Sequence, residues 1–160
     1  MRLIKTLLVF SFSLFCLIYA AQNLVNLEAA HAFIAYIASM PEHAAYPEHI
    51  GPAITSSALV WVMVLTIISA ELAAGGLALW GAWRMWQTRN AGPDAFNAAK
   101  HSGLIAYGIG LLLWFGIFHA VGGAYFQMWQ IEAGRGPFDN SAAFVTMIGI
   151  IFMIVQAPDS

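Results

Sequence analysis

Long apolar stretches separated by short polar segments dominate the chain. A helix needs about 20 apolar residues to cross the hydrocarbon core of a bilayer. Four stretches approach or exceed this length, at residues 3–21, 53–86, 102–129 and 141–157. The pattern predicts an all-α protein with one membrane domain over residues 1–160, a bundle of four transmembrane helices.

The segment between the first two stretches, residues 23–52, contains three Glu, three His and three Pro but no Lys or Arg. Within it, apolar residues recur at helical spacing, at Phe33, Ile34, Ile37 and Met40. We expect a short interfacial helix over residues 28–40, ended by Pro41. The rest of the segment is predicted to be a loop outside the membrane.

The first stretch resembles a secretory signal, because Arg2 and Lys5 precede an apolar run. Cleavage after Ala21 would place the bulky Tyr19 three residues before the cut, where a small residue is required. We therefore expect a retained helix. At the other end, Gly134, Gly136 and Pro137 predict the last connection, with Asp139 or Asn140 capping the fourth span.

Composition and charge agree with a membrane location. Hydrophobic residues make up 61% of the chain and charged residues 9%. Five of the six cationic residues lie near one set of span ends, and only Arg135 lies near the other. The positive-inside rule then predicts a bacterial inner-membrane protein with both termini in the cytoplasm. A net charge of −2 without a basic cluster argues against binding to nucleic acid.

Two polar residues fall near mid-membrane and are candidates for function. Trp61 and Trp80 are 19 residues apart and mark the two interfaces of the second span, which places Glu71 near the bilayer centre. His119 falls at a similar depth on the third span. The sequence allows two interpretations, a proton-handling or ligand-binding pair and a structural hydrogen bond between the helices.

No cofactor is predicted. Haem in a helical bundle needs ligands on facing helices, and His119 is the one histidine within a span, so haem is disfavoured. A bound lipid or quinone needs fewer polar groups. Four aromatic residues of the third span offer walls for such a pocket: Trp114, Phe115, Phe118 and Tyr125.

The remaining residue patterns offer no catalytic or metal site. His31, His43 and His49 are too widely spaced, in a segment interrupted by proline, to predict a metal centre. The single Cys16 forms no internal disulfide. No nucleophile elbow, phosphate-binding loop or zinc-protease motif occurs, so nothing favours an enzyme.

Small residues at every fourth position predict close packing between helices. On the second span this ridge comprises Thr66, Ala70, Ala74, Ala78 and Ala82, and on the third it comprises Gly116, Ala120 and Ala124. Gly75 lies one turn from Glu71 and suggests close approach of a neighbour to the carboxyl group.

The stretch GGAYFQMWQ, the stretch AFIAYIASM and the closing Ala-Pro-Asp resemble a family of uncharacterised bacterial predicted small integral membrane proteins, a domain of unknown function. The matching positions include Asn23, Phe33, Met40, Gly122, Gly123, Phe126, Met128, Trp129, Gln130 and Asp159. The chain departs from the family pattern at Tyr36, Pro41 and Ala124. The resemblance implies four spans and supplies no activity.

Three functional hypotheses remain at this stage. The first is a non-catalytic accessory subunit or assembly factor of a larger inner-membrane complex, respiratory or photosynthetic, whose partners are membrane lipids and other membrane subunits. The second is a small transporter, channel or proton-relay protein that uses Glu71 and His119. The third is a haem- or quinone-binding membrane subunit.

Overall fold

The computed structural model describes residues 1–160 and contains helices but no strands. Its helices are α1 (Arg2–Val25), α2 (Leu27–Ala38), α3 (Ser57–Thr88), α4 (Pro93–Ala99), α5 (His101–Leu111), the π-helix η1 (Leu112–Tyr125) and α6 (Glu132–Gln156). Four stretches are long and apolar enough to cross a membrane, namely α1, α3, the continuous run from α4 to η1, and α6. The predicted all-α class is confirmed, with four candidate spans and a shorter apolar helix, α2.

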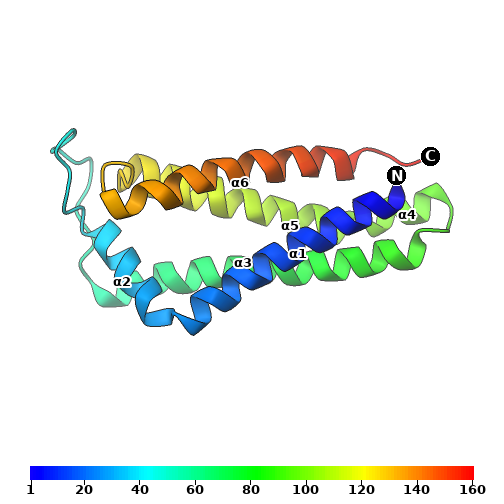
Figure 1. Cartoon of the computed structure of the whole chain (residues 1–160), viewed down its shortest axis with the longest axis horizontal. Helices are drawn as coiled ribbons and strands as arrows, with labels where there is room; N and C mark the ends of the chain where they lie inside the picture. The colour runs from blue at the N-terminus through cyan, green and yellow to red at the C-terminus, as the bar shows by residue number, and fades with distance from the viewer.

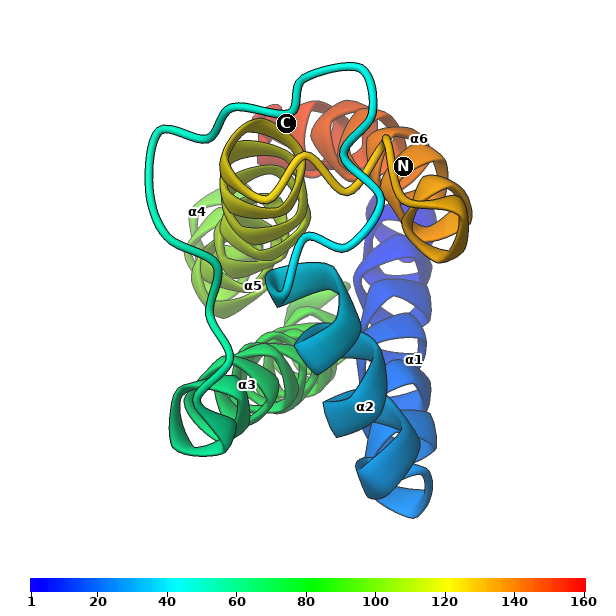
Figure 2. The same ribbon diagram turned by 90° about the vertical axis from the view of Figure 1, so that its left-hand side faces the viewer.

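The four long helices run side by side in an elongated bundle (Figure 1). Helix α1 packs mainly along α3, α3 packs against α5, and α6 packs against η1 and α5. Both chain termini lie at one end of the bundle, beside α4; we call this the terminal end. Helix α2 and the non-helical segment 39–56 lie at the opposite end, which we call the loop end (Figure 2).

The fourth span begins nine residues earlier than predicted, because Gly134, Gly136 and Pro137 lie inside α6 and do not form a connection. Proline fits a helical φ but has no N–H group, so Pro137 cannot donate a hydrogen bond to the Ala133 carbonyl oxygen. Ala133 is exposed. Gly134 is needed for contact, since an added Cβ would lie 2.3 Å from the Met128 carbonyl oxygen. The true connection is shorter, and includes Gln127 at a φ of 46°.

Only part of the small-residue pattern packs as predicted. Ala74, Ala78 and Ala82 are buried on α3, whereas Thr66 is exposed and Ala70 is half-buried. On η1, Ala120 and Ala124 are exposed, and a Cβ on Gly116 would meet nothing within 4 Å. The predicted ridge on the third span therefore makes no close helix contact within this chain.

Close approach between helix backbones occurs elsewhere, where α3 packs against α5. A Cβ added to Gly81 would lie 2.6 Å from the backbone nitrogen of Gly103. Gly75 instead faces α1, where a Cβ would lie 2.6 Å from Leu17 Cγ. Beside it, Ser13 Oγ donates a hydrogen bond of 2.8 Å to the Gly75 carbonyl oxygen. The neighbour that approaches Gly75 is thus α1.

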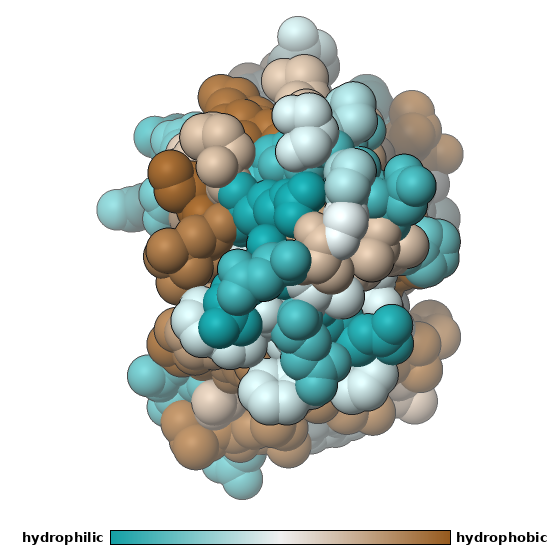
Figure 3. All heavy atoms as spheres, turned by 90° about the vertical axis from the view of Figure 1, so that its right-hand side faces the viewer, coloured by the Kyte–Doolittle hydropathy of each residue, from teal (hydrophilic) through white to brown (hydrophobic).

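The terminal end is held together by a polar cluster around the C-terminal tail. Lys5 Nζ and Lys100 Nζ lie 2.7 Å and 2.5 Å from the same oxygen, Asp159 Oδ2. Both ammonium groups also donate to the carbonyl oxygen of Ala157, and Asn97 pairs with the backbone of Asp159. Hydrophilic side chains gather over the middle of this end (Figure 3).

Burial alone would raise the pKa of the Asp159 carboxyl group, but the hydrogen bonds and charges of Lys100 and Lys5 outweigh burial and lower it. Asp159 thus joins the tail to α1 and to the start of α5. Asp159 therefore has a structural role in this chain.

Candidate functional site

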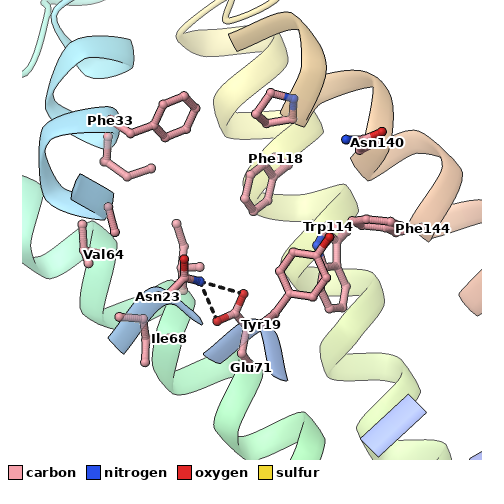
Figure 4. Close-up of a pocket in the computed structure, with 14 residues that line it drawn as sticks. Tyr19, Asn23, Phe33, Val64, Ile68, Glu71, Trp114, Phe118, Asn140 and Phe144 are labelled. Atoms are coloured by element: carbon pink, nitrogen blue, oxygen red, sulfur yellow. Dashed lines mark hydrogen bonds between the residues drawn. The ribbon is translucent and has the colours of Figure 1, made fainter. Parts of the chain in front are cut away.

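The most distinctive feature of the interior is a partly open cavity of about 260 Å³ that contains Glu71. Residues from α1, α2, α3, η1 and α6 line it (Figure 4). It lies in the half of the bundle nearer to α2. A pocket that joins several helices of a bundle is a common location for ligands.

Glu71 is almost completely buried, with 3% of its surface exposed. Its partner is the side-chain amide of Asn23, at the end of α1. Asn23 Nδ2 lies 3.1 Å from Glu71 Oε1 and 2.9 Å from Oε2, so one amide group donates to both oxygens (Figure 4). A carboxylate has about four acceptor sites, and the remaining ones are free for another donor.

Aromatic side chains form one wall of the cavity. Tyr19, Trp114 and Phe144 come from three different helices, and their ring centroids are 5.7–6.5 Å apart. Phe118 continues the wall one turn along η1 from Trp114, and Phe33 faces it from α2. The sequence-based prediction that Trp114 and Phe118 line a pocket agrees with this placement.

The other two aromatic residues of that prediction lie outside the cavity. Phe115 points outward with 61% of its surface exposed, and Tyr125 donates a hydrogen bond to the Pro52 carbonyl oxygen. Sequence reasoning also missed Tyr19, Phe144 and the pairing of Asn23 with Glu71. Asn23 was recognised as a family-like position, but a four-residue helical period cannot tell which side chains meet between helices.

The cavity wall contains an acidic side chain but no basic one. Glu71 is the one acidic residue in its wall, and no lysine, arginine or histidine lines it. The other polar groups are Asn23, Asn140 and the Tyr19 hydroxyl. A carboxylate among aromatic rings, without a cationic partner, suits a ligand that carries a positive charge or a hydrogen-bond donor.

A second cavity of about 220 Å³ adjoins the first, and the two share Phe33, Ile34, Ile67 and Phe118. Its wall includes Gly122, Phe126 and Met128, and it is almost entirely apolar. Several family-like residues therefore line this second cavity. Together the two cavities offer one space for a polar head beside Glu71 and another for an apolar body.

His119 does not contact Glu71, contrary to the predicted pair. His119 Nε2 lies 3.1 Å from Ser141 Oγ on α6, and the Ser141 hydroxyl lies 2.6 Å from the Phe138 carbonyl oxygen. A hydroxyl has one hydrogen, so when Ser141 donates to the carbonyl, His119 donates to Ser141. Glu71 instead pairs with Asn23 on α1, and His119 pairs with Ser141 on α6.

The remaining family-like residues shape the connection after η1 and the outer loop. Gln130 Oε1 accepts hydrogen bonds from the backbone nitrogens of Ala45 and Tyr46, at 2.8 Å and 3.1 Å. Trp129 packs edge-on against Tyr46. A Cβ added to Gly123 would lie 2.5 Å from the ring of Phe138 on α6. Met40 turns the chain at the end of α2 with a φ of 52°.

The loop-end histidines do not gather into one site. His43 and His49 face each other with their Nδ1 atoms 3.3 Å apart, whereas His31 packs on Trp61 and lies 3.3 Å from Ser57 Oγ. No group of three or more His, Cys, Asp or Glu residues lies close enough to hold a metal ion.

The comparisons with known proteins agree with this architecture. The family model described as predicted small integral membrane protein (DUF2165) matches residues 1–158, and the chain belongs to this family. No curated protein and no solved structure matches the chain.

Proposed function

We propose that this integral membrane protein is a non-catalytic binding protein for an apolar organic cation, and that Glu71 is the counter-ion in the cavity. The observation that carries the proposal is a buried carboxylate with free acceptor sites, at the edge of an aromatic-walled cavity that lacks a cationic side chain. The family description gives the membrane location and no activity.

Aromatic faces attract cations, and tryptophan does so most strongly. Trp114, Tyr19 and Phe144 present three rings from three helices beside the carboxylate. A quaternary or protonated amine would place its charge near Glu71 and its apolar part against these rings. The adjoining apolar cavity would accept a longer hydrocarbon tail.

Calorimetric titration with benzyltrimethylammonium tests the proposal on the full chain in a neutral maltoside detergent. We expect saturable binding to the wild type and at least tenfold weaker binding to Glu71→Gln, which keeps the shape but removes the negative charge. Glu28→Gln is the matched control, because Glu28 is exposed on α2 and outside the cavity. Equal binding to wild type and Glu71→Gln would refute the proposal, as would no binding at all.

A second candidate, an accessory subunit of a larger complex, is favoured by one observation on α6. In an apolar stretch of 18 residues on α6, 17% of the residues are buried inside the chain. The corresponding share is 39% for α1 and for α3. Ala142, Thr146 and Gly149 follow one another at helical spacing on the open side, and a Cβ on Gly149 would meet nothing within 4 Å. Small residues on a lipid-facing surface permit close approach of another helix.

Gentle detergent purification with mass spectrometry tests this second candidate. We expect a partner subunit to co-purify with the wild type and with Gly108→Leu, and to be lost from Gly149→Leu. Gly108 also has open space at its Cβ position but lies on α5. Recovery of the 17.4 kDa chain alone would contradict the subunit role.

For location, we propose the inner membrane of a bacterium with both termini in the cytoplasm. Arg2, Lys5, Arg84, Arg89 and Lys100 support this orientation, since they flank the span ends at the terminal end. Reporter fusions to the two termini test it, and activity of a periplasm-specific reporter at either terminus would overturn it.

A further inference from the structure

We propose that the protein has a second binding site, for an anionic phospholipid, in the groove between α1 and α3 at the terminal end. The lipid phosphate would contact Arg2 and Arg89, and one acyl chain would lie along the groove. This site is independent of the cavity at Glu71, and no residue is shared between them.

The groove has a volume of about 280 Å³ and is lined almost entirely by apolar side chains. Its floor is made by Thr6 and Ala82, which are 4% exposed, and its walls by Leu7, Phe10, Leu79, Trp83 and Trp86, which are about half exposed. The Thr6 hydroxyl donates to the carbonyl oxygen of Arg2, so the floor offers no free donor. Such a surface on two candidate spans suits a hydrocarbon chain.

Two arginines lie one helical turn beyond this groove, towards the terminal end: Arg2 precedes Thr6 on α1, and Arg89 follows Trp86 at the end of α3. The Arg89 guanidinium lies over the ring of Trp86, 4.0 Å from its centroid, and Trp86 belongs to the groove wall. Arg2 comes from the first turn of α1, and its Nη1 donates to the carbonyl oxygens of Arg89 at 3.3 Å and Ala91 at 2.6 Å. The Arg2 side chain therefore reaches the backbone at the end of α3, at Arg89 itself.

Neither guanidinium has a carboxylate side chain within ion-pair distance. The two ion pairs of the structure join Lys5 and Lys100 to Asp159, and they leave that cluster with one excess positive charge. Arg2 Nη2 also donates to the Ser160 carbonyl oxygen at 3.5 Å, and Arg89 Nη1 donates to the Trp86 carbonyl oxygen at 2.7 Å. A guanidinium group has five N–H donors, so both arginines keep free donors for a phosphate after these backbone hydrogen bonds.

The charge balance favours an anionic lipid over a zwitterionic one. A phosphocholine headgroup brings its own cation, which would lie among the arginines and the nearby lysines. An anionic headgroup, such as phosphatidylglycerol, brings no such cation. Basic sites between spans on the cytoplasmic side are common binding places for anionic lipids.

Native mass spectrometry of the full chain, after equilibration with equal amounts of phosphatidylglycerol and phosphatidylcholine in mixed micelles, tests the proposal. We expect at least fivefold more retained phosphatidylglycerol on the wild type. The double variant Arg2→Gln/Arg89→Gln should lose this preference. Arg84→Gln is the matched control and should keep it, because the Arg84 guanidinium lies over Trp80, which is outside the groove.

A second variant separates the groove from the polar contacts of the tail. Trp83→Ala removes one wall of the groove and leaves the hydrogen bonds of Arg2 in place. We therefore expect at least threefold less retained phosphatidylglycerol on this variant, and an unchanged circular dichroism spectrum. Three results would overturn the proposal: no preference in the wild type, full retention by the double variant or by Trp83→Ala, and equal loss in Arg84→Gln.

Discussion

At the scale of single residues, the pairing of Glu71 with Asn23 defines the interior. A buried carboxylate usually needs a cationic partner or several donors. Here one neutral amide supplies both hydrogen bonds, and the negative charge of an ionised Glu71 is not compensated by the chain itself. This lack of a cationic partner distinguishes Glu71 from Asp159, whose negative charge lies beside two lysines.

Replacing Asn23 by Leu should destabilise the fold, because the Glu71 side chain loses its donor in a buried place. Leaving a buried acceptor unsatisfied costs about 1–3 kcal/mol. Denaturant titration in detergent measures the change. In the Glu71→Gln background the cost of Asn23→Leu should be smaller, since a neutral amide is cheaper to bury than a charge. Equal costs in both backgrounds would show that the two residues are not coupled.

The same residues show which parts of the site could be predicted from the sequence and which could not. Glu71 stood out because a carboxylate in an apolar helix is costly, and Asn23 stood out as a family-like position. Their contact depends on how α1 crosses α3, which the periodicity of each helix does not specify. For His119, depth in the membrane predicted Glu71 as partner, but the rotation of η1 turns it towards Ser141 on α6.

At the scale of helices, glycine positions decide which faces meet. Gly81→Ala should destabilise the bundle by about 1–3 kcal/mol, because the new Cβ would meet the backbone of Gly103, which cannot move without shifting α5. Gly76→Ala is the matched control on the same helix, where a Cβ meets nothing within 4 Å. It should be neutral or gain up to about 1 kcal/mol from helix propensity. Thermal unfolding of both variants in detergent checks this contrast, and equal melting temperatures would contradict it.

The outer loop gives a second prediction at this scale. Gln130 accepts the backbone hydrogen bonds of Ala45 and Tyr46, so Gln130→Leu should release this part of segment 39–56. Limited proteolysis should then cleave the loop several times faster than in the wild type. Gln87→Leu, an exposed substitution near the terminal end, should leave the rate unchanged. Unchanged cleavage in Gln130→Leu would show that other contacts hold the loop.

The number and order of the helices could be predicted from the apolar stretches, but three of the boundaries could not. Gly134, Gly136 and Pro137 have the composition of a turn, yet the tight connection before Glu132 already reverses the chain. Gly134 then serves contact with Met128. The third span begins earlier, at Pro93, because proline is favoured in the first turn of a helix, and it ends at Tyr125, before Trp129. Local composition could not distinguish a glycine that forms a turn from a glycine that allows close contact with a neighbouring residue.

At the scale of the whole molecule, the two ends of the bundle differ in how they are closed. The loop end is closed by α2 and the loop, with cavities beneath them. The terminal end is closed by the C-terminal tail, which Asp159 fixes to Lys5 on α1 and Lys100 beside α5. The tail therefore connects the first, third and fourth spans.

Asp159→Asn should destabilise this closure, because two nearly buried ammonium groups would lose the anion they share. Removing one partner of a buried ion pair costs about 3–5 kcal/mol. The pH dependence follows from the lowered pKa of Asp159. A carboxyl group with a lowered folded pKa contributes fully above its ordinary value of about 3.9, and the contribution is lost as pH falls through the folded pKa. The melting temperature should thus differ between wild type and Asp159→Asn by the same amount at pH 5 and at pH 8. A difference that grows steadily across this range would show that another group, and not Asp159, controls the terminal end.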